Sequence, residues 1–253
     1  MIACESRRDR TAEPPTRTAA IFDVDGILLA SPHEQAWRDA LRGFAEPARL
    51  TTALYQAHIA GKPRLVGALA ALNALGVADA EAKAPAYADI KQKRLETLIH
   101  TGAVLAYPDA LRFVAALAAL RWKLAVASSS KNATAMMRHI CLSGTGSLLD
   151  IFAVNVCGRD LPMGKPHPAI FLLAAAELQV EPARCLVIED APAGIEAARA
   201  GKMAALGVAR HNDAALLRAA GADLVVSSLD EVSIEGLASG RLCRHLTETV
   251  SKP

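Results

Sequence analysis

Six short apolar runs recur along the chain, and longer segments with helical periodicity separate them. In one of these segments Phe113, Leu117 and Leu120 recur at the i, i+4, i+7 spacing of one helix face. Alternating buried strands and helices are typical of α/β folds, whose parallel sheets are covered on both faces. We therefore predict a Rossmann-like core, a parallel sheet with helices on both faces. Its strands are expected at residues 19–22, 123–127, 154–156, 186–188, 204–208 and 224–226.

The segment between the first two predicted strands is about four times as long as an ordinary crossover helix, and it has helical character throughout. Trp37, Leu41 and Phe44 recur with helical period, whereas Gly76 and Pro85 interrupt the pattern in the middle. A helical insertion of this size is most simply a second domain placed over the strand ends. The predicted organisation is a disordered leader at 1–18, a discontinuous α/β core at 19–31 and 104–240, an all-helical cap domain at 32–103, and a tail at 241–253.

Composition narrows the classes of function. With 52% hydrophobic and 21% charged residues, the chain fits a globular protein with a full-sized core. A net charge of +2 gives no case for a nucleic-acid partner. No apolar run approaches the roughly 18–20 residues that cross a bilayer, so no membrane association is expected. The five cysteines are widely spaced and form no CxxC pair, which indicates free thiols in a reducing compartment and a cytoplasmic location.

Two carboxylates one residue apart, Asp23 and Asp25, end the first apolar run and precede Gly26. Their side chains would point the same way if the strand continued. Crowded like charges are unfavourable unless a cation or a shared proton relieves them. A metal site, an acid/base site and a simple Asp-Gly turn all remain open from these residues alone.

Polar groups also follow the other predicted strands, and ligands of an open parallel sheet bind outside the carboxyl ends of its strands. After the second strand come Ser128, Ser129, Ser130, Lys131 and Asn132, after the third Gly164, Lys165 and Pro166, and after the fourth Glu189 and Asp190. Their expected meeting at one sheet edge favours a shared site over a simple turn.

This set of side chains suits phosphoryl transfer. An all-oxygen site of the kind that Mg²⁺ prefers would be formed by Asp23, Asp25, Glu189 and Asp190. The Ser128 hydroxyl, the N–H groups at the following helix start and the Lys165 ammonium would neutralise the phosphoryl oxygens. One aspartate of the first pair would attack phosphorus, and the other would protonate the leaving oxygen and later take a proton from water or an alcohol.

The order and spacing of these residues resemble the four motifs of the haloacid dehalogenase-like superfamily. The helical insertion resembles the cap of its subfamily I. Within the superfamily, the segments 127–132, 164–166 and 188–195 are similar to those of the β-phosphoglucomutase group. The resemblance covers about residues 19–230.

The resemblance implies that Asp23 is the nucleophile, forming an aspartyl-phosphate, and also a ligand of Mg²⁺. Asp25 would be the general acid/base and would add its backbone carbonyl to the metal. Asp190, with Glu189 close by, would complete the metal site. The phosphoryl group would be held by Ser128, Lys165 and Asn132.

A Gly-Lys-Pro-Arg loop in the insertion resembles the cap loop whose arginine grips the phosphate that is not transferred. Arg64 can bind an anion bidentately and Lys62 adds charge, although a solvated basic turn is the alternative. Lys91 lies near the position of a second cap lysine, and His33 resembles a cap-hinge histidine. The hinge departs from many relatives, because Ala30-Ser31 stands where they have Asp-Ser or Asp-Thr.

We therefore expect a Mg²⁺-dependent phosphatase that acts on a small phosphorylated metabolite such as a sugar phosphate. A β-phosphoglucomutase-type phosphotransfer is the alternative, since both reactions share the first transfer to Asp23. A dehalogenase is disfavoured because dehalogenases of this superfamily typically lack the second aspartate of the first motif, which this chain has as Asp25. A sensor that only binds phosphorylated ligands is disfavoured because all the catalytic residue types are present.

Overall fold

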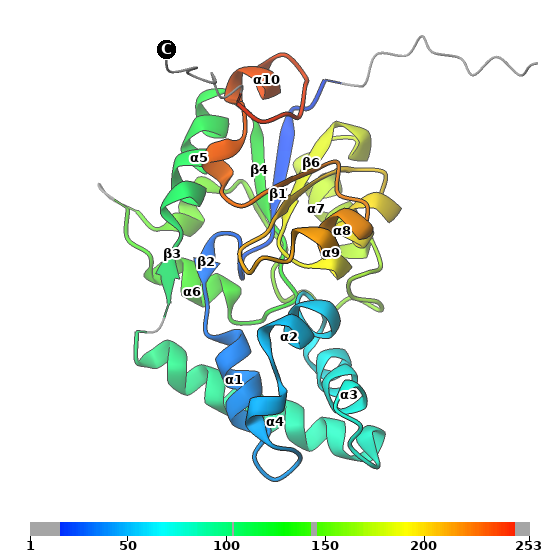
Figure 1. Ribbon diagram of the computed structural model, residues 1–253. Coiled ribbons are helices and arrows are strands. Elements are labelled where there is room, and N and C mark those ends of the chain that lie inside the picture. The colour runs from blue at the N-terminus through cyan, green and yellow to red at the C-terminus, as the bar shows by residue number, and fades with distance from the viewer. Residues whose placement is uncertain (1–15, 103, 143–145, 246–253) are drawn as a thin grey trace, which may run out of the picture.

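The computed structural model describes residues 16–102, 104–142 and 146–245, and its centre is a six-stranded, fully parallel sheet (Figure 1). The strands are β1 (Ala19–Phe22), β4 (Lys123–Val126), β5 (Val154–Asn155), β6 (Cys185–Glu189), β7 (Ala204–Val208) and β8 (Leu224–Val226). Their order in the sheet is β5-β4-β1-β6-β7-β8. The α/β fold is confirmed, and the apolar runs locate each strand to within one residue at either end.

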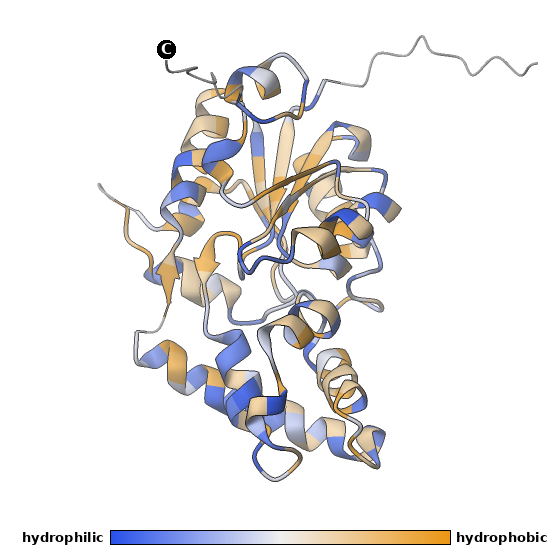
Figure 2. Cartoon of the chain, viewed as in Figure 1, coloured by the Kyte–Doolittle hydropathy of each residue, from blue (hydrophilic) through white to orange (hydrophobic). Residues whose placement is uncertain are grey.

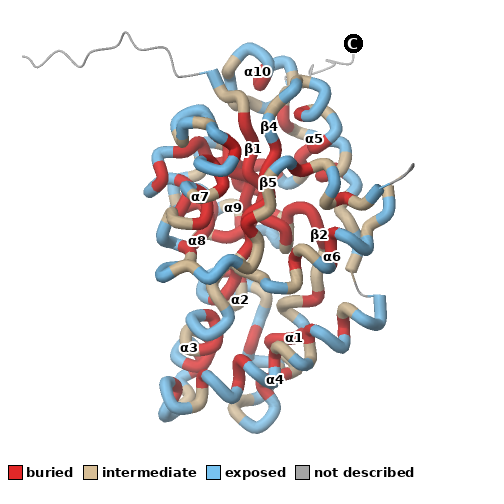
Figure 3. The backbone as a smooth tube through the Cα atoms, turned by 180° about the vertical axis from the view of Figure 1, so that it is seen from behind, coloured by how far each residue is buried: buried red, intermediate tan, exposed pale blue. Residues whose placement is uncertain are grey.

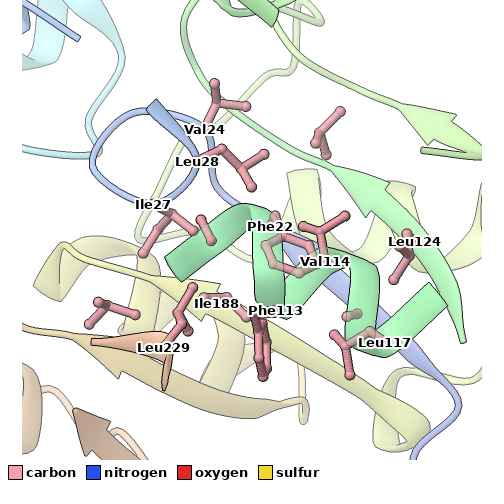
Figure 4. Close-up of a cluster of buried hydrophobic side chains, with 14 of the residues drawn as sticks. Phe22, Val24, Ile27, Leu28, Phe113, Val114, Leu117, Leu124, Ile188 and Leu229 are labelled. Carbon is pink, nitrogen blue, oxygen red and sulfur yellow. The ribbon is translucent and has the colours of Figure 1, made fainter. Parts of the chain in front are cut away.

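Helices cover both faces of this sheet because successive strand side chains alternate between two hydrophobic clusters. Phe22 joins one cluster, which Figure 4 shows, and its neighbour Ile21 joins the other. The first cluster is covered by α5 (Pro108–Ala119), α6 (Ala133–His139) and α10 (Ile234–Ala238). The second is covered by α7 (Ala169–Leu178), α8 (Pro192–Ala200) and α9 (Ala214–Ala219). Figures 2 and 3 show the result, strands that are mostly apolar and buried.

Four helices inserted after β1 form a separate layer at one end of the molecule (Figure 1). These inserted helices are α1 (His33–Ala40), α2 (Thr52–His58), α3 (Arg64–Ala74) and α4 (Ala80–His100). They share a hydrophobic cluster of their own, which includes Trp37, Leu72 and Tyr87. The Tyr87 hydroxyl donates a 2.8 Å hydrogen bond to the Trp37 carbonyl and ties α4 to α1.

Two features of the insertion differ from expectation. A two-stranded antiparallel sheet of β2 (Leu29–Ala30) and β3 (Leu105–Ala106) links the insertion to the core, and two-residue strands are too short to show a period. Pro85 was expected to interrupt the helical pattern, but it lies inside α4. Proline removes one helical N–H donor, and the buried side chains around it hold α4 in place. Gly76 does end α3, with φ +67° in the turn before α4.

At both ends of the described chain, residues outside the predicted core boundaries contact the core. Thr18 was assigned to the leader, but its N–H donates to Arg184 O and its carbonyl accepts from Lys123 N–H, so it extends β1. Arg244, assigned to the tail, donates to Val225 O and pairs with Glu231. Residues 1–15 and 246–253 lie outside the described residues. Within the described ranges no helix combines the length and apolarity of a membrane span.

Candidate active site

The sheet topology brings the predicted motifs to one edge. β1 pairs in parallel with β4 on one side and β6 on the other. The Asp23 N–H donates to Ile188 O at 3.0 Å, and Ala127 N–H donates to Phe22 O at 2.9 Å. The carboxyl ends of three adjacent strands therefore present Asp23, Ser128 and Glu189 at the same level.

Lys165 lies at the centre of this edge with its side chain fully buried. Its ammonium donates at 2.5 Å to Asp23 Oδ1 and at 2.5 Å to Glu189 Oε1. Burial alone would lower the pKa of Lys165, but these two carboxylates raise it above its ordinary value. Lys165 is therefore charged at neutral pH, and it fixes the orientation of Asp23.

Both oxygens of the fully buried Glu189 accept hydrogen bonds from protein groups. Its Oε1 accepts from Lys165, and its Oε2 accepts from the N–H groups of Asp190 and Ala191 at 3.0 and 2.9 Å. Gly194 packs so closely on this carboxylate that a Cβ there would collide with it. These contacts hold Glu189 in place behind Asp23, and its role as a metal ligand stays a prediction.

The Asp25 carboxylate is only partly satisfied by the protein groups that the structure describes. Its Oδ1 is buried and accepts no hydrogen bond from any residue that the structure describes. Its Oδ2 accepts from the Ser128 hydroxyl at 3.3 Å, and the nearest basic nitrogen to Oδ1 is His33 Nε2 at 3.6 Å. A buried carboxylate oxygen without a partner is costly, so a ligand or cation is expected to fill the space beside it.

The raised pKa values of Asp23 and Asp190 also favour a cation at this sheet edge. Burial, partly offset by Lys165, and then repulsion from Glu189 and Asp25 raise the pKa of Asp23 to about 8. Burial and the charges of Glu189 and Asp23 raise the pKa of Asp190 well above its ordinary value. A divalent cation would relieve both effects. Within the described ranges no three side chains of His, Cys, Asp or Glu form a ready metal cluster, so such a cation would also need backbone or water oxygens.

The loop after β4 differs from expectation in its hydrogen bonding. The Ser130 N–H donates to Ser128 Oγ at 3.1 Å, and the Asn132 N–H donates to Ser130 Oγ at 3.3 Å. The hydroxyls of Ser128, Ser129 and Ser130 line the cavity, but Asn132 does not. The part of Asn132 in phosphate binding stays a prediction, as does that of Lys165, which does not line the cavity either.

His33 and Lys91 meet beside Asp25, although 58 residues separate them. Lys91 Nζ lies 3.1 Å from His33 Nδ1 and 4.9 Å from the centre of the Trp37 ring. Burial lowers the pKa of His33 to about 4 and that of Lys91 to about 8. At neutral pH His33 is thus uncharged and accepts a hydrogen bond from the lysine.

A cavity of about 640 Å³ lies between the sheet edge and the inserted helices. The predicted residues that line it are Asp23, Asp25, His33, Lys62, Arg64, Lys91, Ser128 and Asp190. The loop that carries Lys62 contacts the core directly, since Ser129 Oγ donates to Gly61 O at 3.4 Å and Pro63 packs on Gly164. The carboxylates of the sheet edge, Ser128 and the basic groups of the inserted segment therefore line one cavity.

Sequence reasoning missed Arg210, which follows β7 at the same sheet edge. Its guanidinium donates to both oxygens of Asp109, at 2.7 and 3.1 Å, and to Gly26 O at 3.2 Å. It also stacks on Tyr107, 4.1 Å from the ring centre. Arg210 thereby holds the turn that follows Asp25. Listing the residues after β7, as for the other strands, would have found it.

Comparison with known proteins agrees with the motifs. The family model of haloacid dehalogenase-like hydrolases matches residues 18–202. β-Phosphoglucomutase of Bacillus subtilis is 41% identical over 113 residues, which span 45% of this chain and 45% of that protein. The phosphorylated carbohydrates phosphatase of Thermotoga maritima is 33% identical over 82% of this chain and 93% of its own length.

Solved structures show the same likeness. The crystal structure of an archaeal β-phosphoglucomutase from Pyrococcus sp. strain ST 04 has a TM-score of 0.69 and 30% sequence identity. It covers 88% of this chain and 99% of that one, so the likeness includes both the sheet and the inserted helices.

Proposed function

This chain belongs to the haloacid dehalogenase-like hydrolase family, and we propose that it is a Mg²⁺-dependent phosphatase acting on a small sugar phosphate. The buried ion-pair centre of Asp23, Lys165 and Glu189, from which Asp23 faces the cavity, is the observation that carries the proposal. The named phosphatase and mutase relatives support the substrate class.

In the proposed reaction the Asp23 carboxylate attacks phosphorus and the substrate oxygen leaves. Asp25 donates a proton to that oxygen, and an aspartyl-phosphate forms on Asp23. Asp25 then takes a proton from water, whose oxygen attacks phosphorus and releases inorganic phosphate and free Asp23. Lys165 and the Ser128 hydroxyl hold the phosphoryl oxygens during both steps.

The residues fit a Mg²⁺ ion, because Asp25 Oδ1 lacks a partner and Asp23 and Asp190 have raised pKa values. Asp23, Asp190 and the Asp25 backbone carbonyl would hold it. Bound there, Mg²⁺ would supply positive charge against the phosphoryl oxygens. Gly26 brings the Asp25 turn against Asp190, and no side chain fits at that position.

A mutase is the second candidate, and the basic residues Lys62 and Arg64 across the cavity from Asp23 favour it. They would bind a second phosphate group, as a bisphosphate intermediate requires. The two reactions differ only in the final acceptor, which is water in a phosphatase and a sugar hydroxyl in a mutase.

The function is tested by assaying a panel of sugar phosphates with Mg²⁺ and with EDTA. The panel includes β-glucose 1-phosphate with a trace of the 1,6-bisphosphate. We expect Mg²⁺-dependent release of inorganic phosphate. Glucose 6-phosphate formed without phosphate release would identify a mutase. Full activity in EDTA would reject the metal-dependent mechanism, and no turnover of any compound would favour a sensor.

Arg64→Ala should lower kcat/KM by roughly 10–100-fold for substrates with a second anionic group, because a charge-assisted hydrogen bond is lost. Steady-state kinetics on such a substrate and on p-nitrophenyl phosphate provide the measurement. Arg42→Ala, an exposed arginine outside the cavity, is the control. Equal losses on both substrates would remove the anion-binding role of Arg64.

A further inference from the structure

One buried amide on the inserted helices has no structural partner. Gln56 lies on α2 and is only 3% exposed, yet its Oε1 accepts no hydrogen bond from the described part of the chain. An unpaired buried polar atom costs folding free energy, and native structures rarely keep one without a reason.

Gln56 lines the same cavity as the carboxylates of the sheet edge. Its neighbour Tyr55 also lines the cavity, and after burial the charges of Asp190 and Asp25 are the main causes that raise the pKa of Tyr55. Helix α2 therefore faces the catalytic carboxylates across the cavity. A group bound to Asp23 by its phosphate would place the rest of its structure against this helix.

Gln92, a half-buried glutamine of the same cavity, differs from Gln56 in having a protein partner. Gln92 on α4 also lines the cavity, but its amide nitrogen donates a 2.8 Å hydrogen bond to Glu96. Gln92 thus has a structural partner on its own helix, whereas Gln56 lines the cavity and its Oε1 has no partner in the described part of the chain. This contrast singles out Gln56 as a group kept for a ligand.

We propose that Gln56 is a specificity-determining residue that hydrogen-bonds a hydroxyl group on the non-phosphorylated part of the substrate. An amide offers a donor and an acceptor side by side, and a hydroxyl group also donates and accepts. The inference rests on the proposed phosphatase function and deepens it. Gln56 would make the enzyme prefer polyhydroxylated phosphates to phosphate esters whose remainder is apolar. A site that pairs with a hydroxyl strongly rejects the analogue that lacks it.

Gln56→Met tests this proposal, since methionine keeps the length and shape of the side chain without its polar atoms. Kinetics are measured on the best sugar phosphate, on its single-deoxy analogues and on p-nitrophenyl phosphate. We expect kcat/KM to fall roughly 10–100-fold for the sugar phosphate and to stay unchanged for p-nitrophenyl phosphate and for one deoxy analogue. That analogue identifies the hydroxyl that Gln56 contacts.

The ligand-free variant should also melt at a higher temperature, by about 2–4 °C, because an unpaired buried amide has been removed. Gln92→Met is the matched control and should leave unchanged the ratios of kcat/KM among the sugar phosphate, its deoxy analogue and p-nitrophenyl phosphate. A lower melting temperature, or an equal loss on all substrates, would show a structural role and overturn the inference. Unchanged kinetics on every substrate would overturn it while leaving the phosphatase function intact. If the wild type turns over no phosphate ester, the proposed function fails and this inference with it.

Discussion

Asp23→Asn should abolish turnover, with kcat lowered by roughly 10⁴-fold or more, because an amide is a poor nucleophile. The protein should still fold, since asparagine has nearly the same shape and relieves the repulsion among the buried carboxylates. Lys165 keeps its second partner, Glu189, at 2.5 Å. Phosphate release from the best substrate and thermal melting of the variant are the measurements.

A companion variant distinguishes a nucleophile from a residue that only binds metal. Asp25→Asn retains Asp23 but lacks both the acid of the first transfer and the base that takes the proton from water. The substrate is therefore p-nitrophenyl phosphate, whose leaving group needs no proton, so that only the second step is blocked. We expect phosphate to remain covalently attached, and mass spectrometry of a rapid digest should find it on the peptide containing Asp23. Asp89→Asn, an exposed position on α4, is the matched control and should show full turnover. Near-normal activity of Asp23→Asn would reject the mechanism.

The sequence predicts the fold well because parallel strands have a strong local signature. Each buried strand is a short apolar run, and the polar residues that follow it must meet at the carboxyl edge. Asp23, Ser128 and Lys165 converge there for this reason. The two-residue strands β2 and β3 have no such signature, because only their pairing with each other defines them.

The hydrogen bonds within the site could not be predicted from the sequence. Glu189 is a carboxylate at a strand end, as a metal ligand would be, but Lys165 and two N–H groups occupy it. Asn132 follows the right strand, but the loop closes on its own serine hydroxyls first. Such competition depends on tertiary geometry that spacing does not record. Gln56 lies in no motif, and only its burial without a partner reveals it.

Lys165→Met should both inactivate the enzyme and destabilise it. The change leaves Asp23 and Glu189 buried without their cation, and breaking a buried ion pair from one side costs about 3–5 kcal/mol of unfolding free energy. Loss of a positive charge from the phosphoryl site should lower kcat by roughly 10²–10³-fold or more. Urea denaturation in EDTA gives the stability, and phosphate release with Mg²⁺ gives the activity.

The pH dependence of that instability has a definite sign. The pKa of Asp23 is already raised to about 8 in the folded protein, and removal of Lys165 raises it further. A carboxyl whose pKa is raised in the folded protein binds more protons in the folded state than in the unfolded state. The free energy of unfolding therefore falls as the pH rises above the pKa of the unfolded state, about 3.9. Below about pH 8 folded Asp23 is protonated in both proteins, so the gap in unfolding free energy between wild type and variant should stay level from pH 5 to pH 7 and widen as the pH rises through about 8.

Lys123→Met is the matched control, because Lys123 on β4 donates one 2.8 Å hydrogen bond to Leu178 O from an exposed position. Its loss should cost only about 1 kcal/mol, with no change in the pH slope. If Lys165→Met were as stable as this control at pH 8, the two carboxylates could not both be charged in the folded protein. Lys165 would then be dispensable to the charge balance around Asp23, because protonation of one of the two carboxyls would provide that balance instead.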